Sequence, residues 1–457
     1  MVPFSALILI GLLCALLCVY TLIEQGEIFI PYAFTMFGAL NALLCLGLYH
    51  RRRSILDEQK ALRMKQIGIL GSGQLGRMLA QAGVSLGVPC KFLDDLRSKD
   101  RRNRRAPATT TGEVDGRGFD DPDVLTHFAE GLSVLSYEFE NVPLHAAKLL
   151  EQRVPVRPSP RSLEVAQDRL NERELFERVG IASPKHAAVE TLAELETALA
   201  AGFPLPAIIK TRRLGYDGKG QARLRELGDA AEAWATIAAH GVNEASADVR
   251  VPAILDEMIP FVRELSVVAV RGQDGEVRCY PPFENVHESG ILRKSVCPAP
   301  GVSGERIAEL ESAARKIGED LGHIGVFAVE FFETAPDRDG STSLLANEIA
   351  PRVHNTGHGT IEGHHTSQFE NHLRAILGLP LGSTAARGHS AMLNIIGDWP
   401  DRDALLRIPG LSLHNYEKSA KPGRKIGHVT LVAASAEELA AKTAEAEAVI
   451  AGSTVLA

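Results

Sequence analysis

The sequence predicts an α/β protein of about three domains, with an apolar hairpin ahead of them. At 457 residues, the chain has room for that many domains of roughly 150 residues each. Strand-like apolar segments alternate with helical patterns, beginning with Gln66–Leu70 and the glycine turn that follows it. Later apolar runs carry a single charged residue, as Lys210 and Glu330 show. This pattern is typical of a mixed α/β (α+β) architecture.

The first 63 residues differ in character from the rest of the chain. Val2–Ile23 and Ile28–Tyr49 are uncharged apolar runs, each reaching the roughly 20 residues that cross a bilayer. The acidic connector between them and the arginines at 51–53 predict a two-helix transmembrane hairpin with both ends in the cytoplasm. Residues 1–49 would then anchor a cytoplasmic remainder to the membrane. Two other interpretations stay open: a small membrane protein fused in frame, or upstream sequence translated ahead of a true start at Met64.

Overall charge and cysteine usage exclude several classes of protein. The formal net charge is −8, which gives no basic footprint for a nucleic acid. The basic run Arg101–Arg105 is local, and we expect a solvated loop there. The six cysteines form no CxxC pair, which fits a reducing compartment and argues against structural zinc or a disulfide framework.

A glycine-rich turn opens the first soluble domain. Gly71–Gly76 reads GxGxxG between a strand and a helical pattern, and Asp94 and Asp95 follow the next strand. By local pattern this predicts a dinucleotide site, although the same turn can hold another anion or only pack the helix on the strand. Glu138 ends the strand Ser133–Tyr137, where open α/β sheets bind ligands. A helix N-cap region is the alternative for that acid.

The middle of the chain carries a phosphate-clamping pattern. Pro206–Lys210 is a strand ending in a lysine, and the glycine-rich loop Thr211–Gln221 follows. A lysine supplies a point charge, and such a loop can lay backbone N–H groups over phosphates. The Walker A sequence is absent, and a plain hairpin loop is the alternative.

Two further apolar segments each contain one carboxylate. Glu330 lies within Gly325–Phe332, and Glu348 follows Asn347 in the strand-like start of Leu344–His358. A lone acid in an apolar strand is costly to bury unless something compensates its charge. Two antiparallel strands would bring both acids together around Mg²⁺, and Arg352 and His354 could receive an anion beside it. Two strands with one satisfied acid each are the alternative.

Several longer motifs resemble one family of the ATP-grasp superfamily, the 5-(carboxyamino)imidazole ribonucleotide synthases. The residues that carry the resemblance are GQLGRM (Gly73–Met78), YEFENVP (Tyr137–Pro143), RRLGYDGKGQ (Arg212–Gln221), NVHESGILR (Asn285–Arg293), NEIAPRVHNTGH (Asn347–His358), SQFENHLRAILGLPLG (Ser367–Gly382) and KPGRKIGH (Lys421–His428). The resemblance implies a Rossmann-like domain at 64–163, an ATP-grasp domain at 164–366 and a small C-terminal domain at 367–457. The hydrophobic extension has no place in the family pattern.

The family's reaction, as the resemblance implies it, is the ATP-dependent carboxylation of 5-aminoimidazole ribonucleotide by bicarbonate, through carboxyphosphate. ATP and Mg²⁺ are the implied cofactors, with Mn²⁺ as a substitute, and a homodimer is the implied assembly. Carried over by motif, the nucleotide residues are Arg169, Lys210, Gly215, Tyr216, Asp217, Gly218, Lys219, Gly220 and Gln221 at the phosphates, Asp256, Glu257, Met258 and Ile259 at the adenine, Glu264 at the ribose, and His287, Asn347 and Glu348. Glu330 and Glu348 would bind the metal. The ribonucleotide and carboxyphosphate would contact Tyr216, Asp217, Lys219, Arg352, His354, Asn355, Arg424, Lys425 and Glu138.

Other functions explain less of the sequence. An NAD-dependent oxidoreductase accounts only for Gly71–Asp95 and leaves the carboxylate pair without a role. A different ATP-grasp ligase accounts for the ATP residues but not for KPGRKIGH or NVHESGILR. A non-enzymatic membrane scaffold accounts for residues 1–63 alone. Association with a downstream mutase is left open.

Overall fold

The structure is a computed structural model, and it describes residues 16, 20–26, 47–53, 66–97, 106–214, 220–241, 250–336 and 342–452. The chain divides into two compact units, Met1–Met64 and Lys65–Ala457. In the first unit, the described residues include helical stretches at 20–24 and 47–53. All the strands described below belong to the second unit.

The predicted fold class is wrong in its membrane part. Across the ranges given above, no helix combines the length and apolar character that crossing a bilayer requires. Most of the two apolar runs, Val2–Ile23 and Ile28–Tyr49, lies outside the described residues. The basic run Arg101–Arg105, expected to be a solvated loop, also lies outside them.

A parallel sheet begins the second unit, with strand order β3-β2-β1-β4. Its strands are β1 (Gln66–Leu70), β2 (Cys90–Leu93), β3 (Glu113–Asp115) and β4 (Leu132–Tyr137). The accompanying helices are α3 (Gln74–Ser85), η1 (Pro107–Thr110), α4 (Pro122–Ala129), α5 (Leu144–Glu151) and α6 (Pro160–Ala166). The strand–turn–helix expected after residue 66 is therefore present. Helix α4 begins where Asp121 accepts the N–H of Asp123 and proline occupies the first turn.

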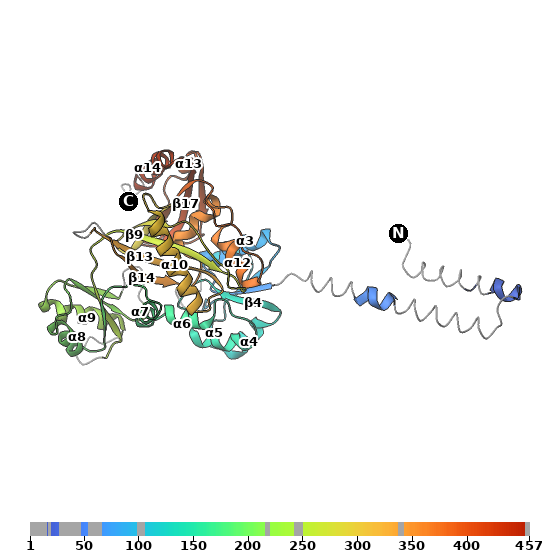
Figure 1. The fold of residues 1–457 in the computed structure, drawn as a ribbon, viewed down its shortest axis with the longest axis horizontal. Coiled ribbons are helices and arrows are strands. Elements are labelled where there is room, and N and C mark those ends of the chain that lie inside the picture. The colour runs from blue at the N-terminus through green and yellow to red at the C-terminus, as the bar shows by residue number, and fades with distance from the viewer. Residues whose placement is uncertain are drawn as a thin grey trace. The chain divides into compact units, whose positions relative to one another are not determined.

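A second four-stranded sheet, antiparallel and called the small sheet below, has the order β5-β8-β6-β7. Its strands are β5 (His186–Val189), β6 (Ala207–Thr211), β7 (Gln221–Leu224) and β8 (Ala253–Glu257). Helices α8 (Leu192–Ala200) and α9 (Ala230–Gly241) lie together beside it, with the short η2 (Leu227–Asp229) between β7 and α9 (Figure 1). Trp234 of α9 is buried against Ile209 and Leu224 of the sheet. The predicted strand ending in Lys210 is β6.

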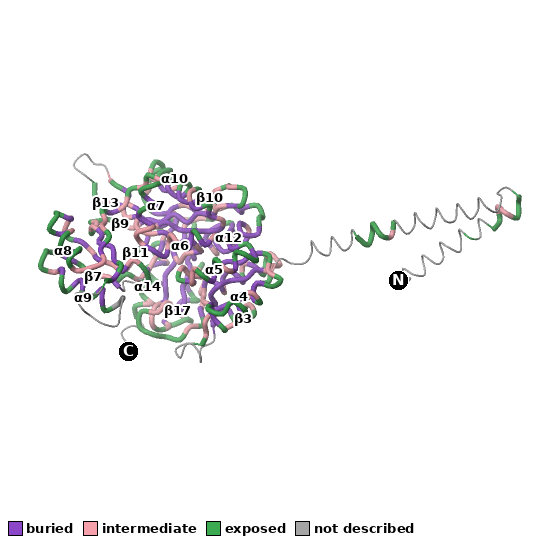
Figure 2. The backbone as a smooth tube through the Cα atoms, turned by 90° about the horizontal axis from the view of Figure 1, so that it is seen from below, coloured by how far each residue is buried: buried purple, intermediate pink, exposed green. Residues whose placement is uncertain are grey.

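The largest sheet in the described residues runs β14-β13-β9-β11-β12-β15-β17-β16, with β10 paired to β9. Its strands are β9 (Phe261–Arg271), β10 (Val277–Cys279), β11 (Phe283–Glu288), β12 (Ile291–Cys297), β13 (Gly325–Thr334), β14 (Leu344–Ala350), β15 (His389–Ile396), β16 (Leu411–Asn415) and β17 (Lys425–Ala433). The remaining helices are α7 (Arg169–Arg178), α10 (Gly304–Asp320), η3 (Asn355–Gly359), α11 (Thr360–Gly363), α12 (Gln368–Leu377), α13 (Arg402–Leu406) and α14 (Ala436–Gly452). Buried residues lie along the strands of the large sheet, and exposed residues lie on the outer helices (Figure 2).

Side-chain alternation gives the large sheet two different faces. On β13, Phe327 and Val329 pack in one cluster with α7 and α10. Val326 and Ala328 face the opposite way and pack in a second cluster with α12 and α3. Helix α12 therefore lies between the large sheet and the first sheet, which joins the two regions through one core. Glu330 continues the row of Val326 and Ala328, so its side chain belongs to this second face.

Removing a core side chain from α10 tests the first of these clusters. We expect Ile317→Ala to lower the free energy of unfolding by about 2–4 kcal/mol, because Ile317 is fully buried against the sheet. Urea unfolding followed by circular dichroism measures the change. Lys316→Ala, at the exposed neighbouring position, is the matched control and should stay within about 0.5 kcal/mol of wild type. Equal losses in both variants would contradict the packing described here.

Candidate active site

An open cleft of about 890 Å³ lies where the three sheets approach one another. Most residues predicted from the sequence line it: Glu138, Arg169, Lys210, Gln221, Asp256, Glu257, Met258, Ile259, Glu264, His287, Glu330, Asn347, Glu348, Arg352, His354, Asn355 and Lys425. Arg424 and Gly220 are described but are not among the lining residues. Gly215, Tyr216, Asp217, Gly218 and Lys219 lie outside the described residues. The cleft thus collects groups that are far apart in the sequence.

The two central carboxylates are cross-strand neighbours. Glu330 of β13 pairs in register with Glu348 of β14, as the two strand segments predicted. The next pair is Phe331 with Ala346, so Asn347 is an extra residue in β14. Such a bulge turns side chains away from strict alternation. It places Asn347 and Glu348 together at the cleft, with the Glu330 and Glu348 side chains 13% and 41% exposed.

Residues of α7 bind the backbone on both sides of Glu348. The N–H of Ile349 donates to Glu172 Oε1 at 2.9 Å, and Arg173 Nη1 donates to the carbonyl oxygen of Asn347 at 2.7 Å. Both side chains are buried. Side chains of α7 therefore provide hydrogen-bond partners for the backbone N–H and C=O groups at the bulge.

The carboxylate pair fits a divalent cation. Burial, and then the charge of Glu348, raise the pKa of Glu330 above its ordinary value, because two facing carboxylates resist being ionised together. A cation between them would remove that repulsion, and hard oxygen ligands suit Mg²⁺. The described residues contain no cluster of three or more His, Cys, Asp or Glu able to hold a metal ion.

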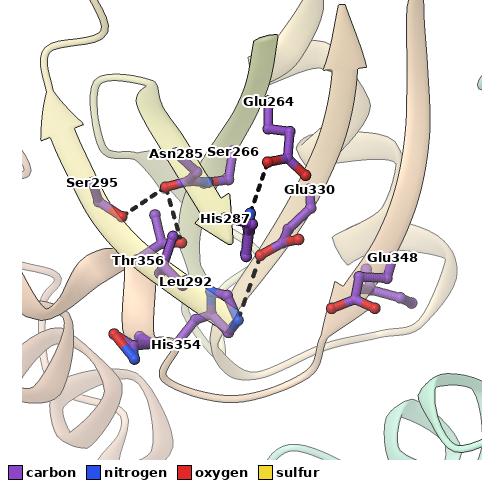
Figure 3. Close-up of polar contacts among 12 residues, drawn as sticks. Glu264, Ser266, Asn285, His287, Leu292, Ser295, Glu330, Glu348, His354 and Thr356 are labelled. Atoms are coloured by element: carbon purple, nitrogen blue, oxygen red, sulfur yellow. Dashed lines mark hydrogen bonds and ion pairs between the residues drawn. The ribbon is translucent and has the colours of Figure 1, made fainter. Parts of the chain in front are cut away.

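Two histidines flank Glu330 (Figure 3). His287 Nδ1 lies 2.8 Å from Glu264 Oε2, and although burial opposes it, this hydrogen bond and nearby carboxylates raise the pKa of His287. His354 Nε2 lies 3.7 Å from Glu330 Oε1. Burial and the positive charge of Arg352 lower the pKa of His354 well below its usual range, so its imidazole is neutral. His354 can therefore donate one hydrogen bond to an anion without adding a charge.

Behind these residues, the buried amide of Asn285 joins three strands to η3. Asn285 Nδ2 donates to Ser266 Oγ at 2.7 Å, and Asn285 Oδ1 accepts from Ser295 Oγ at 2.7 Å and from Thr356 Oγ1 at 3.4 Å. The side chains drawn in Figure 3 show this group beside Glu264 and His287. A buried hydrogen-bond network of this kind holds its side chains in place.

The glycine turn of the first sheet holds a side chain of its own chain. The N–H groups of Gly73 and Gly76 donate to the two carboxylate oxygens of Glu138, the second at 2.6 Å. Ser72 binds Asp94 through its N–H and its hydroxyl. The helix N-terminus that the pattern offered to a dinucleotide is thus occupied by Glu138, which is 6% exposed.

Two arginines and an asparagine also line the cleft. Arg352 forms an ion pair with Glu140 and donates to the carbonyl oxygen of Val353 at 2.9 Å. Arg169 Nη1 lies 3.8 Å from Glu348 Oε2. Asn355 exchanges two amide hydrogen bonds with Asn394, at 3.2 and 3.0 Å, so β15 fixes its side chain. Arg424 instead donates to Ser419 Oγ at 3.0 Å.

Several functional residues were missed by the sequence reasoning. They are Glu140, Glu172, Arg173, Asn285 and Gln368. Gln368 accepts from the N–H of His354 and donates to the carbonyl oxygen of the same residue, at 2.9 and 2.6 Å. Glu140, Asn285 and Gln368 lie inside quoted motifs, and that position was the available signal. Nothing in the local pattern marked Glu172 or Arg173, because charged residues occur on every side of α7.

Three family models match the second unit. A ribonucleotide synthetase preATP-grasp domain matches residues 64–167, an ATP-grasp domain matches 174–369, and a phosphoribosylaminoimidazole carboxylase C-terminal domain matches 390–442.

Curated relatives align along nearly their whole length. The N5-carboxyaminoimidazole ribonucleotide synthase of Pseudomonas aeruginosa is 45% identical over 386 residues, covering 84% of this chain and 99% of the relative. The protein of the same name from Brucella melitensis is 41% identical over 371 residues, covering 80% and 96%.

Solved structures agree with these alignments. The N5-carboxyaminoimidazole ribonucleotide synthetase from Thermus thermophilus matches with a TM-score of 0.75 and 46% identity, covering 84% of this chain and 98% of that one. An N5-carboxyaminoimidazole synthase from Aspergillus clavatus, in complex with ADP and 5-aminoimidazole ribonucleotide, matches with a TM-score of 0.73 and 32% identity, covering 85% and 98%.

Glu172 predicts how stability depends on pH. Burial, and then the charge of Glu348, raise the pKa of Glu172 from its ordinary 4.5 to about 8, against the opposing charge of Arg169. The folded protein then keeps a proton that the unfolded chain releases, so wild-type stability falls as pH rises from about 4.5 to 8. Glu172→Gln keeps the acceptor for the Ile349 N–H but removes this titration. The difference in free energy of unfolding, variant minus wild type, should therefore increase by about 1–3 kcal/mol when the pH is raised from 5.5 to 8.5.

Urea unfolding at both pH values, without nucleotide or metal, measures this gain. Glu174→Gln, at an exposed position on the same helix, is the control and should show the wild-type profile. A Glu172→Gln profile parallel to wild type would mean that Glu172 is already ionised in the folded protein at neutral pH.

Proposed function

The chain belongs to the N5-carboxyaminoimidazole ribonucleotide synthase family, and we infer that it carboxylates 5-aminoimidazole ribonucleotide with ATP and bicarbonate. The observation that carries the inference is a single cleft in which the carboxylate pair of the large sheet meets a lysine of the small sheet and an arginine of α7. The family assignment made from the motifs is confirmed. The oxidoreductase alternative has no support, since Glu138 occupies the glycine turn.

The reaction requires bicarbonate to be activated before an amine can attack its carbon. Transfer of the γ-phosphoryl group of ATP to a bicarbonate oxygen gives carboxyphosphate and ADP. The amine nitrogen of the ribonucleotide then bonds to the carboxyl carbon while the carbon–oxygen bond to phosphate breaks, and phosphate and a proton leave. Charge develops on phosphoryl oxygens in both steps, where positioned cations and hydrogen-bond donors stabilise it.

The nucleotide occupies the side of the cleft formed by α7 and the small sheet. Lys210 and Arg169 bind its phosphates, and the family resemblance adds Gly215–Gln221, of which residues 215–219 lie outside the described residues. Glu257–Ile259 line the adenine, and the stacked rings of Phe261 and Phe332, 4.6 Å apart, add an apolar wall beside them. Asp256 does not share this role, because its carboxylate is 1% exposed and is bound to Lys210 and Arg173. We assign Glu264, which is hydrogen-bonded to His287, to the ribose hydroxyls.

Glu330 and Glu348 would hold Mg²⁺ on the phosphates, with the Asn347 amide beside them. When bound, the metal supplies positive charge to the transferring phosphoryl group. The protein keeps both carboxylates facing each other. The pairing of β13 with β14 does this, together with the hydrogen bonds between α7 and the bulge.

The acceptor side combines cations with fixed hydrogen-bond donors. Arg352, Lys425, His354 and Asn355 line it and are proposed to bind carboxyphosphate and the ribonucleotide. The family resemblance adds Tyr216, Asp217 and Lys219, which lie outside the described residues. Arg424 and Glu138 have weaker support, because Arg424 is bound to Ser419 and Glu138 is engaged by the glycine turn.

We also propose a homodimer and the domain boundaries 64–163, 164–366 and 367–457. The family resemblance supports the dimer. The three matched family models, each lying mainly within one of these ranges, support the boundaries. Light scattering coupled to size exclusion measures the assembly.

ADP release tests the substrate assignment. With ATP, Mg²⁺ and bicarbonate present, we expect ADP formation to rise strongly when 5-aminoimidazole ribonucleotide is added. A coupled assay for ADP, with a parallel assay for the labile carboxylated product, measures the reaction. If the protein binds ATP but the ribonucleotide changes neither signal, this chain has a different acceptor.

Neutralising either carboxylate should lower activity and weaken the binding of Mg²⁺. We expect Glu330→Gln and Glu348→Gln each to lower kcat by about 10²–10³-fold, since each loses a charged ligand that matters most when phosphoryl charge develops. Activity titrated with Mg²⁺ should also show a higher half-saturating concentration. Glu276→Gln, an exposed carboxylate paired with Arg278, is the control. Unchanged Mg²⁺ dependence in both variants would place the metal elsewhere.

A further inference from the structure

Three charges meet beneath the phosphate side of the cleft. Lys210 Nζ lies 2.9 Å from Asp256 Oδ2, and Arg173 Nη2 lies 3.2 Å from the same oxygen. Arg173 Nε also approaches Asp256 Oδ1, at 3.4 Å. One carboxylate is therefore shared by two cations, and the proposed function uses only one of them.

The two cations differ in where they can go. Lys210 lines the cleft, and its side chain is 15% exposed. Arg173 is 1% exposed, does not line the cleft, and is held from its other side by the carbonyl oxygen of Asn347 at 2.7 Å. Phe176 packs against its guanidinium, with 5.9 Å between the guanidinium carbon and the ring centroid. Arg173 is therefore fixed, while Lys210 can reach a ligand.

Asp256 requires a permanent partner. Its carboxylate is 1% exposed, and leaving a buried carboxylate unpaired is strongly unfavourable. If Lys210 were its only cation, turning the ammonium toward a phosphate would leave Asp256 unpaired. With Arg173 in place, the ammonium can move at much lower cost.

We propose that Arg173 is a positioning residue for the nucleotide: it keeps Asp256 neutralised, so that Lys210 is available to the phosphates of ATP. This inference rests on the proposed assignment of Lys210 to ATP. The same guanidinium donates to the bulge next to Glu348. Arg173 therefore connects α7 both to the Asp256–Lys210 pair and to the strand that carries Glu348.

Charge-matched variants test this role through equilibrium ATP binding, measured with Mg²⁺ but without bicarbonate or ribonucleotide. In Arg173→Gln, Lys210 becomes the sole cation on Asp256, and we expect the Kd for ATP to rise at least about tenfold. Adding Asp256→Asn removes the competing charge, so the double variant should return to within about threefold of wild type. Arg178→Gln, which removes an exposed ion pair on the same helix, should leave the Kd unchanged.

The outcomes separate this proposal from its premise. Lys210→Ala must weaken ATP binding; if it does not, the assignment of Lys210 fails. If Lys210→Ala weakens binding but folded Arg173→Gln does not, only the role of Arg173 is overturned. A double variant that is folded yet as weak as Arg173→Gln overturns it too, because a merely structural defect predicts no rescue. If Arg173→Gln alone fails to fold by circular dichroism, the double variant decides: near-wild-type affinity supports the proposal, and weak affinity overturns it.

Discussion

The repulsion between two carboxylates on neighbouring strands is the constraint around which the site is built. Glu330 and Glu348 face each other where the sheet is only partly covered, and neither strand can turn its acid away without losing the register of the buried residues beside it. The cation Arg169 lies beside Glu348, and the neutral imidazole of His354 lies beside Glu330. Hydrogen bonds between α7 and the backbone of β14 hold the strand that carries Glu348.

The position of the site follows from how the faces of one sheet are covered. The row Val326, Ala328, Glu330 begins under α12 and ends at the cleft. Where helical cover stops, the alternation that buries Val326 and Ala328 turns the Glu330 carboxylate toward the cleft. Core residues and a cleft-lining residue are thus consecutive members of one row, so the geometry of the cleft depends on the packing of α12.

Much of this could be predicted from the sequence, because single charges in apolar strands are conspicuous and the strands containing Lys210, Glu330 and Glu348 are where the pattern put them. Longer-range features were hidden. The glycine turn looked like a nucleotide motif, since spacing alone does not show that the distant Glu138 fills it. The bulge at Asn347 depends on strand register, and the burial of Arg173 depends on what packs on α7. The N-terminal hairpin, predicted from two long apolar runs and the charges that flank them, is not supported, because no described helix is long and apolar enough to cross a membrane.

The large sheet also shows why the strands from His389 onward cannot be regarded as a detachable accessory. Strand β15 hydrogen-bonds directly to β12, and β17 and β16 continue from it. A chain ending before His389 would leave β12, with Leu292 and Val296, as an open edge of unpaired peptide groups. Such an edge is a template for association with other chains. Completion of this sheet therefore protects the newly made chain from association through β12.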